Sequence, residues 1–420
     1  MTVARNLVST AIIGALFFIF GFVTWLNGPL ITFSQLAFQL NEVNAFLILT
    51  AFFLSYFFLA IPSSWILRRT GMKKGLALGL FVMAVGAALF GQFATQRWYP
   101  GALGGLFTIG AGLALLQTAV NPYISILGPI ESAAQRIAVM GICNKIAGIL
   151  APFAIGALVM QGIGDLSAKV EAADPATREL LLNDFAAKVH MPYLAMAGLL
   201  ALLAVGVLKS PLPEISASEV NAGAPGDDGR SIWQYPQLWL GALCIFVYVG
   251  AEVMAGDAIG TYGRGFGLPL DETKLFTSRT LGAMLIGYIT GLAIIPRIVS
   301  QERWLLVSAV LGIALTVGAY FTTGYASVWM VAALGFANAM MWPAIFPLAI
   351  RGLGRFTELG SGILIMGIVG GAIIPRLFAT LKQTHDFQLV FLLLMVPCYV
   401  YILYFAWRSH RAEAPYGVMR

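Results

Sequence analysis

The chain has 420 residues, of which 59% are hydrophobic and only 10% are charged, and its formal net charge is +6. A soluble domain is closer to half apolar and a quarter charged, and a transmembrane β-barrel shows short alternating segments, so the long apolar runs indicate an all-α membrane protein. The three cysteines, Cys143, Cys244 and Cys398, all lie inside apolar runs, so we expect neither a disulfide nor a metal site.

The first half of the sequence predicts six transmembrane spans, at residues 8–37, 44–67, 74–93, 99–127, 136–160 and 190–209. The first span is interrupted by Asn27-Gly28-Pro29, and it is too long for a signal-peptide core, so we interpret it as an uncleaved span. A polar segment at 161–189 precedes the sixth span.

Residues 210–235 are rich in Pro, Gly, Ser and acidic side chains, which is typical of a linker. Six more spans follow, at residues 236–263, 273–297, 303–323, 327–350, 358–379 and 386–407. We therefore predict 12 transmembrane helices in two six-helix domains, residues 1–209 and 236–420.

The distribution of basic residues predicts the orientation of these helices. Two sets of six spans put both termini on one side, and that side holds 15 Lys and Arg residues against 9 on the other. Basic residues collect on the cytoplasmic side, so we expect cytoplasmic termini and a multi-pass protein of the inner membrane.

The two halves also show a weak internal repeat. When Asn121-Pro122 in the fourth span is aligned with Trp342-Pro343 in the tenth, Gln117 falls on Asn338. Two pseudo-symmetric bundles with a binding site between them are typical of an alternating-access transporter.

Amide side chains inside the spans are the candidate substrate ligands, because amides both donate to and accept from sugar hydroxyls. Gln117 and Asn121 are four residues apart and share a helix face. The alternative for such residues is an interhelical hydrogen bond, and for Trp342 it is groove filling instead of stacking on a sugar ring. The predicted substrate-binding set is Asn27, Gln117, Asn121, Asn144, Asn338 and Trp342.

Lys145 lies about ten residues into its predicted span, and Glu252 and Asp257 are the two acidic residues that lie furthest inside a span. Intramembrane charges usually mark ion or proton steps, so either acid is a candidate for coupling. The alternative is a structural ion pair between Lys145 and Glu252, with Asp257 at the outer end near an arginine. No HExxH, GxSxG or GxxxxGK[ST] motif occurs, so we expect neither enzymatic activity nor a bound cofactor.

Several runs resemble the fucose/glucose/galactose permease family of the major facilitator superfamily, namely FFIFGFVTWLNGPL, GLALLQTAVNPYISILGP, YVGAEV and GFANAMMWPAIFPLAIRGLG. The run GICNKIAGILAP is most similar to the glucose/galactose and N-acetylglucosamine branch. The resemblance implies the superfamily fold, and it would place a proton-binding Asp at Gly28 and a Glu at Gln117. This chain has neither acid, so Glu252 or Asp257 would have to supply the coupling group. Asn144 matches an amide of the family, and Trp342 replaces a tyrosine.

The predicted function is secondary import of a neutral monosaccharide, namely glucose, galactose or N-acetylglucosamine, coupled to H⁺ or Na⁺. Lys145 leaves an acidic sugar as an alternative substrate. We expect a monomer whose partners are the sugar and the lipid bilayer, with no nucleic acid. An uncoupled uniporter, a transporter-like sugar sensor and a membrane-embedded enzyme are the alternative functions.

Overall fold

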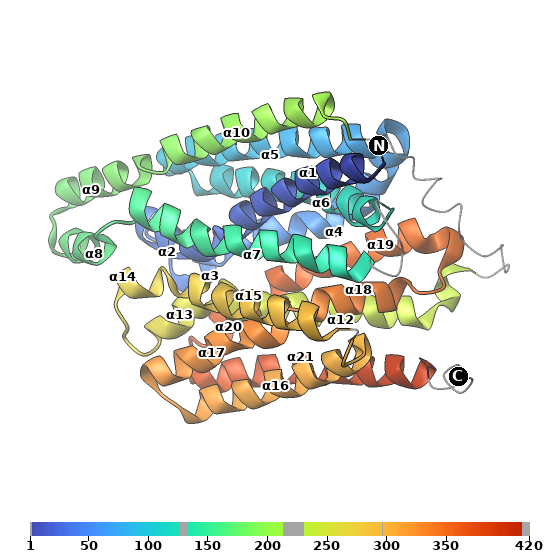
Figure 1. Cartoon of the computed structure of the whole chain (residues 1–420). Helices are drawn as coiled ribbons and strands as arrows, with labels where there is room; N and C mark the ends of the chain where they lie inside the picture. The colour runs from blue at the N-terminus through green and yellow to red at the C-terminus, as the bar shows by residue number, and fades with distance from the viewer. Residues whose placement is uncertain (1, 127–132, 213–230, 296, 414–420) are drawn as a thin grey trace.

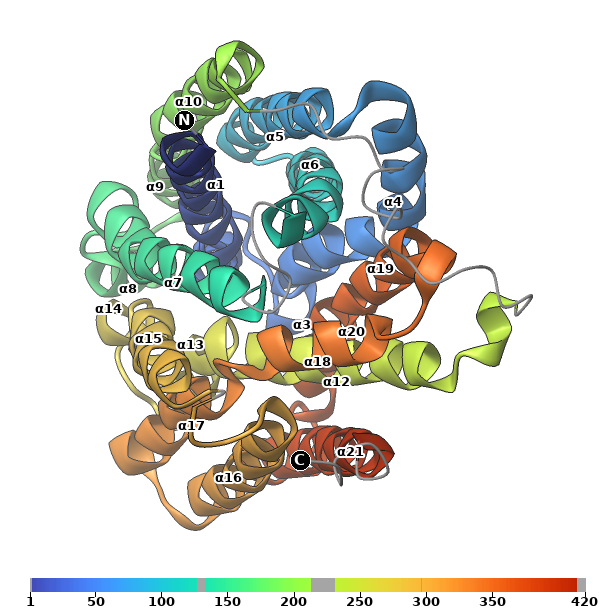
Figure 2. The ribbon, with the colours of Figure 1, turned by 45° about the vertical axis from the view of Figure 1, so that its right-hand side comes forward.

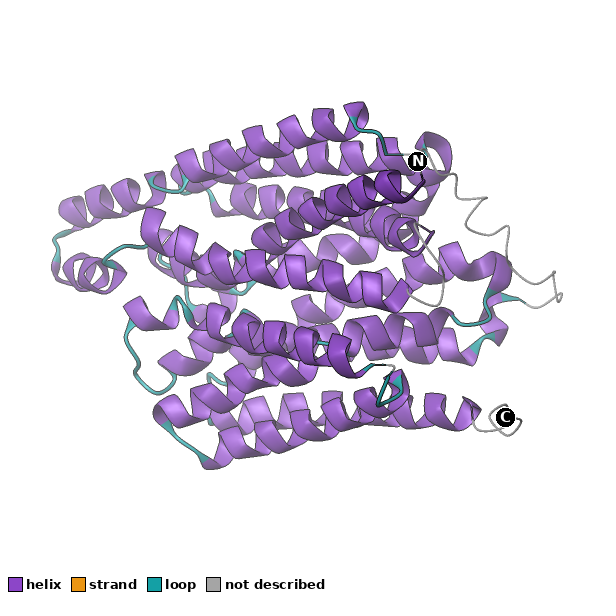
Figure 3. Ribbon diagram, in the orientation of Figure 1, coloured by secondary structure: helices purple, strands orange, loops and turns teal. Residues whose placement is uncertain are grey.

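The computed structural model describes residues 2–126, 133–212, 231–295 and 297–413. Within these ranges every regular element is a helix (Figure 3). The prediction of an all-α protein is therefore confirmed.

The first half of the chain forms seven long or medium helices that run along the molecule (Figure 1). They are α1 (Thr2–Trp25), α2 (Asn27–Ala37), α4 (Leu47–Thr70), α5 (Met72–Thr95), α6 (Tyr99–Ile126), α7 (Ala133–Leu158) and α10 (His190–Lys209). Short helices connect them: α3 (Glu42–Ala45), α8 (Ile163–Ala172) and α9 (Pro175–Ala187). Asp174 begins α9, where its carboxylate accepts hydrogen bonds from the backbone N–H groups of Ala176 and Thr177.

The second half repeats this pattern of long helices joined by short ones. The long and medium helices are α12 (Pro236–Gly256), α15 (Phe276–Ile294), α16 (Gln301–Phe321), α17 (Gly324–Asn338), α18 (Met341–Ile350), α19 (Thr357–Met366), α20 (Gly370–Leu381) and α21 (Phe387–Glu413). The short helices are η2 (Ile232–Gln234), α13 (Ile259–Arg264), α14 (Leu270–Thr273), η3 (Gly354–Phe356) and η4 (Gly367–Val369).

Eleven stretches of the described residues are long and apolar enough to cross a bilayer. The predicted span at 273–297 is not among them, but its helix α15 has 19 residues and packs against α7 and α17. At 1.5 Å per residue, α15 reaches about 28 Å, close to the thickness of the hydrocarbon core. With α15 the fold contains twelve membrane-crossing helical units.

The first, seventh, tenth and eleventh of these units are interrupted within the span, the eleventh by η4 between α19 and α20. Helix α1 ends at Trp25 because Pro29 has no N–H to donate to the Trp25 carbonyl. Pro343 likewise has no N–H for the Ala339 carbonyl, and the tenth unit breaks between α17 and α18. The seventh unit breaks at Asp257, between α12 and α13.

The helices up to α10 form one group and those from α12 onward form a second (Figure 1). Figure 2 shows α4 and α7 of the first group facing α19 and α15 of the second, and these pairs pack together. Residues 213–230 lie outside the described residues, so the predicted linker and domain boundaries stay predictions.

Helix α1 begins and α21 ends at the same end of the molecule, which we call the terminus end (Figure 1). Helices α8, α9 and α14 lie at the opposite end, which we call the hairpin end.

Candidate functional site

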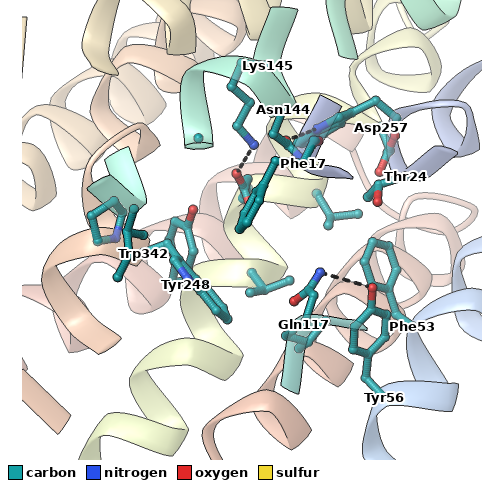
Figure 4. A pocket seen from close by; sticks show the side chains of 18 of the residues that line it. Phe17, Thr24, Phe53, Tyr56, Gln117, Asn144, Lys145, Tyr248, Asp257 and Trp342 are labelled. Atoms are coloured by element: carbon teal, nitrogen blue, oxygen red, sulfur yellow. Dashed lines mark hydrogen bonds and ion pairs between the residues drawn. The ribbon is translucent and has the colours of Figure 1, made fainter. Parts of the chain in front are cut away.

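A cavity of about 130 Å³ lies between the two helix groups, and side chains from α1, α4, α6, α7, α12, α15 and α18 line it. In Figure 4, Tyr248 and Trp342 of the second group lie at the left, and Asp257 of that group lies at the upper right, near Asn144 of the first group. We call it the central cavity. Known ligand pockets measure roughly 300–1,000 Å³, so its size favours a small ligand.

A buried ion pair joins the two groups across the central cavity. The Lys145 ammonium in α7 lies 3.0 Å from the Glu252 carboxylate in α12, and the two side chains are 7% and 13% exposed. The same ammonium lies 4.4 Å from the centroid of the Trp25 ring, within range of a cation–π interaction. Of the two interpretations left open by the sequence, the structure therefore shows Lys145 paired with Glu252. The pair leaves no net charge at this point of the cavity.

Asn144 lies beside this ion pair and holds Trp25 in place. The Trp25 indole N–H donates to the Asn144 side-chain oxygen at 3.2 Å. A Cβ atom added at Gly148 or at Gly256 would lie 2.5 Å from the Trp25 ring, so both glycines allow helices α7 and α12 to approach this indole closely. Trp25 therefore packs at the point where the two groups meet.

Hydroxyl and amide groups form the rest of the polar lining. The Gln117 amide donates to the Tyr56 hydroxyl at 3.3 Å, and both residues line the cavity (Figure 4). Tyr248 and Tyr288 line it from the second group. Trp342 stacks on Phe346 with a centroid distance of 5.7 Å. Such groups suit a ligand with several hydroxyls and an apolar ring face.

Asp257 lines the cavity but, unlike Glu252, forms no ion pair with a described residue, and the backbone of Gly28 is the polar group nearest its carboxylate. Its side chain is 2% exposed, and neither carboxylate oxygen forms a hydrogen bond with the described residues. A Cβ atom added at Gly28 would lie 3.0 Å from Asp257 Oδ1 and 2.6 Å from Thr277 Oγ1. The Asp257 carboxyl group, at the break between α12 and α13, is therefore packed against α2 of the first group. It lies close to Gly28, the position at which the resemblance would place an acidic residue.

Three predicted ligands are not shown in the cavity lining. Asn27 and Asn338 are buried, at 1% and 0% exposure, but do not line the cavity. Asn338 accepts a hydrogen bond from the Tyr399 hydroxyl at 2.9 Å inside the second group. Asn27 and Asn338 each lie at a helix break. Their side chains therefore point in a different direction about the helix axis from the direction expected in a continuous helix. The side chain of Asn121 lies outside the described residues.

Tyr56, Tyr248, Tyr288 and Phe53 are lining residues that the sequence reasoning missed. Tyrosine and phenylalanine are common in apolar spans and do not stand out. One signal was available: Tyr248 precedes Glu252 by four residues, so the two share a helix face.

At the hairpin end, one acidic residue of the first group binds two basic residues of the second. The Glu42 carboxylate lies 2.6 Å from the Lys382 ammonium and 3.7 Å from the Arg264 guanidinium. Arg264 also donates to the Thr32 hydroxyl at 3.3 Å. Burial lowers the pKa of Lys382 and of Arg264, and the Glu42 charge opposes that effect at both. Glu42 therefore holds two partly desolvated cations against the first group.

Three more hydrogen bonds join the two groups, at the hairpin end and between that end and the central cavity. The Gly164 N–H donates to Asp271 at 3.1 Å, Lys274 donates to the Met160 carbonyl at 2.8 Å, and Ser278 donates to the Ile149 carbonyl at 2.8 Å. Burial alone would raise the pKa of Asp271, but the hydrogen bonds from Lys274 and from the Gly164 N–H together hold that pKa below its usual value. Together with Glu42, these contacts close the hairpin end of the molecule.

Comparison with known proteins identifies relatives along almost the whole chain. Residues 13–375 match the family described as Major Facilitator Superfamily. A glucose/galactose transporter of Brucella abortus is 35% identical over 400 residues, which cover 93% of this chain and 91% of the relative. An L-fucose-proton symporter of Escherichia coli is 27% identical and covers 96% of this chain and 93% of its own length. The crystal structure of FucP in the outward conformation is 25% identical, covers 96% of this chain and 99% of its own, and superposes with a TM-score of 0.77.

The buried ion pair generates a prediction about stability. We expect Glu252→Gln to lower the free energy of unfolding by about 3–5 kcal/mol, because Lys145 would remain charged and buried without its partner. The double variant Lys145→Met/Glu252→Gln should lose less free energy of unfolding than Glu252→Gln or Lys145→Met alone. Thermal unfolding of the purified protein measures the effect, and additive losses in the double variant would contradict a coupled pair.

The contacts at the hairpin end generate a prediction about accessibility. We expect Glu42→Gln to open this end more often, because Lys382 and Arg264 would repel each other without the carboxylate. A cysteine introduced by Val249→Cys, in a background without the native cysteines, reports the opening, since Val249 lines the central cavity. The rate at which an impermeant maleimide labels this cysteine from the hairpin side should rise about fivefold. This rise corresponds to a decrease of about 1 kcal/mol in the free energy of opening the hairpin end.

Glu179→Gln is the matched control for this measurement. It removes an ion pair with Arg97 at the same end of the molecule, but both residues belong to the first group. Equal labelling in the two variants would show that Glu42 has no particular role in closing the hairpin end.

Proposed function

The chain belongs to the major facilitator superfamily, and from this premise we propose that it imports a neutral monosaccharide by alternating access, coupled to the movement of protons. The substrate is glucose, galactose or N-acetylglucosamine. The termini face the cytoplasm, the hairpin end faces outward, and the protein works as a monomer in the inner membrane without an organic cofactor.

The observation that supports this proposal best is the chemistry of the central cavity. Its lining combines amide and hydroxyl groups with a tryptophan, and its one ion pair is internally neutral. A charged sugar would meet no uncompensated cation at Lys145, because Glu252 already neutralises that ammonium. A neutral sugar can exchange hydrogen bonds with Gln117 and the tyrosines without leaving a buried charge. The volume of about 130 Å³ favours one sugar ring over an oligosaccharide.

The sugar binds between the two helix groups. Gln117 and Tyr56 hydrogen-bond its hydroxyls from one side, and Tyr248 and Tyr288 do so from the other. Trp342 covers the apolar face of the ring. Asn144 acts through Trp25, whose position it fixes by their hydrogen bond. Because both groups contact the sugar, its binding favours states in which they are close together.

Asp257 is the group that takes up the coupled proton. A buried ionised carboxylate without a partner costs several kcal/mol, so in this conformation the group is neutral or binds a cation. A proton neutralises it without needing further ligands. Glu252 is unsuitable for this step because it is already engaged in the ion pair with Lys145.

The position of Asp257 connects protonation with movement of the two groups. The carboxyl group is enclosed by the contact between α13 and α2 that forms when the hairpin end is closed. Opening the hairpin end would return Asp257 to water, where the ionised form is favoured. Closure therefore requires the proton, and each bound ligand favours binding of the other.

Counterflow into proteoliposomes tests the substrate class. We expect vesicles loaded with unlabelled glucose, galactose or N-acetylglucosamine to accelerate entry of the labelled sugar at least tenfold, with gluconate and disaccharides inactive. Trp342→Ala should reduce the affinity about fivefold to tenfold, because a stacking surface worth about 1 kcal/mol is lost. Bound sugar without any counterflow would indicate a sensor instead of a transporter.

Replacement of Asp257 tests the coupling mechanism. In the wild-type protein a pH gradient of one unit should drive accumulation of up to about tenfold for one proton per sugar. Asp257→Asn mimics the protonated acid, so we expect counterflow to continue while accumulation disappears. Accumulation that survives in Asp257→Asn, or that follows a sodium gradient and not a pH gradient, would contradict the assignment.

A further inference from the structure

The indole of Trp25 fills the space between α7 and α12, where it is only 3% exposed. A Cβ atom added at Gly148 of α7 would lie 2.5 Å from Trp25 Cδ1, and one added at Gly256 of α12 would lie 2.5 Å from Trp25 Cζ3. The first of these atoms belongs to the five-membered ring and the second to the six-membered ring. The indole therefore spans the whole gap from one helix group to the other.

The indole lies on the hairpin side of the ion pair between Lys145 and Glu252. Helices α7 and α12 both run toward the hairpin end, where α7 leads into α8 and α12 leads into α13 and α14 (Figure 1). Gly148 follows Lys145 by three residues and Gly256 follows Glu252 by four, which is about 4.5 Å and about 6 Å along the axes. The ammonium lies 4.4 Å from the centroid of the ring, so the ring covers this side of the ion pair.

Asp257 lies beyond the indole. It follows Gly256 directly, and it is five residues, or about 7.5 Å, further along α12 than Glu252. The Gly28 backbone of α2 and the Thr277 hydroxyl of α15 lie beside its carboxyl group. The indole therefore separates the ion pair from the second acid.

Two charged side chains act electrostatically on the Asp257 carboxyl group, namely Glu252 and Lys145. Among the described residues that line the central cavity, Lys145 is the only basic one. The other titratable groups of the lining are the phenols of Tyr56, Tyr248 and Tyr288. One ammonium neutralises one carboxylate, so whichever acid does not pair with Lys145 needs a proton.

The ammonium of a lysine is carried on a flexible stem, so it could pair with either acid if nothing stood in its way. The position of Trp25 removes this choice, because the ring attracts the ammonium to its face beside Glu252 and blocks the way to Asp257. Asn144 keeps the ring in this position, since its side-chain oxygen accepts a hydrogen bond from the indole N–H at 3.2 Å.

We propose that Trp25 is a positioning residue that keeps Lys145 paired with Glu252 and thereby assigns the coupled proton to Asp257. The proton enters from water when the hairpin end is open and adds to a carboxylate oxygen of Asp257, and no other group changes its protonation. The inference rests on the proposed function, because it takes proton coupling as given.

Infrared difference spectroscopy of the sugar-bound protein at neutral pH tests the proposal, since a protonated carboxyl group has a distinct carbonyl stretch. In Glu252→Gln the band should remain, because Trp25 still keeps Lys145 away from Asp257. In Trp25→Ala/Glu252→Gln it should fall at least about fivefold, because the ammonium then pairs with the Asp257 carboxylate. Adding Lys145→Met should restore the band, a result that general loss of structure or entry of water would not give.

The pH dependence of sugar binding is a second readout in the same variants. At pH values where free Asp257 is ionised, Glu252→Gln should lose about tenfold in affinity per pH unit, because one proton binds with each sugar. Trp25→Ala/Glu252→Gln should lose less than about twofold per unit, because its closed state needs no proton.

Phe20→Ala/Glu252→Gln is the matched control. Phe20 is a buried aromatic residue of the same helix α1, at 1% exposure, but it does not line the central cavity. This variant should keep both the band and the steep pH dependence. Should Trp25→Ala not fold, Trp25→Val leaves a smaller void and is still too short to reach Gly256, so the same results are expected from it.

The outcomes separate this inference from the proposed function. A band kept in Trp25→Ala/Glu252→Gln, a band not restored by Lys145→Met, or equal loss in the Phe20 control would overturn the role of Trp25 alone. Loss of the band in Glu252→Gln with Trp25 intact would do the same. A wild-type protein without the band would contradict the proposed coupling, and this inference with it.

Discussion

The balance of charge in the central cavity is the constraint on which the rest of the account depends. Lys145, Glu252 and Asp257 line this cavity, and the first two neutralise each other across the interface. The third, Asp257, is packed against the backbone of α2 and forms no ion pair with a described residue. An apolar membrane protein tolerates such a group only when it is neutral or when water can reach it. This constraint is the basis of the proposed linkage between the position of the two groups and the ionisation of Asp257.

This constraint gives the two acids different roles. Glu252 contributes to the contact between α7 and α12, and together with Trp25 it holds Lys145 at a fixed position. Asp257 lies at the break between α12 and α13, where a small movement of α13 away from α2 exposes it. At the hairpin end the contacts of Glu42 with Lys382 and Arg264 stabilise the closed arrangement. In the proposed mechanism, closure therefore involves partly buried ion pairs at the hairpin end and a protonated Asp257 in the interior.

Much of the fold follows from patterns that act over short distances. The apolar runs predict the spans, and Gly28-Pro29 predicts the break after Trp25 because the proline removes a hydrogen bond at a known position.

The site is harder to predict because its geometry depends on which spans face each other. Lys145 and Glu252 are 107 residues apart, so no helical periodicity relates them. Asn338 illustrates a second limit, since the break that follows it changes its rotation relative to Trp342. The sequence identified both Asp257 and Glu252 as candidate coupling residues. Only the three-dimensional contacts show that Glu252 pairs with Lys145 while Asp257 packs against Gly28.

Infrared difference spectroscopy of the purified protein tests the role of Asp257 most directly, because the carbonyl stretch of a protonated carboxyl group is distinct from the bands of a carboxylate. We predict such a band in the wild-type protein when bound sugar holds the hairpin end closed at neutral pH. The band should be absent from Asp257→Asn and present in Glu252→Gln. A wild-type protein without the band, or a band lost in Glu252→Gln and kept in Asp257→Asn, would contradict the account.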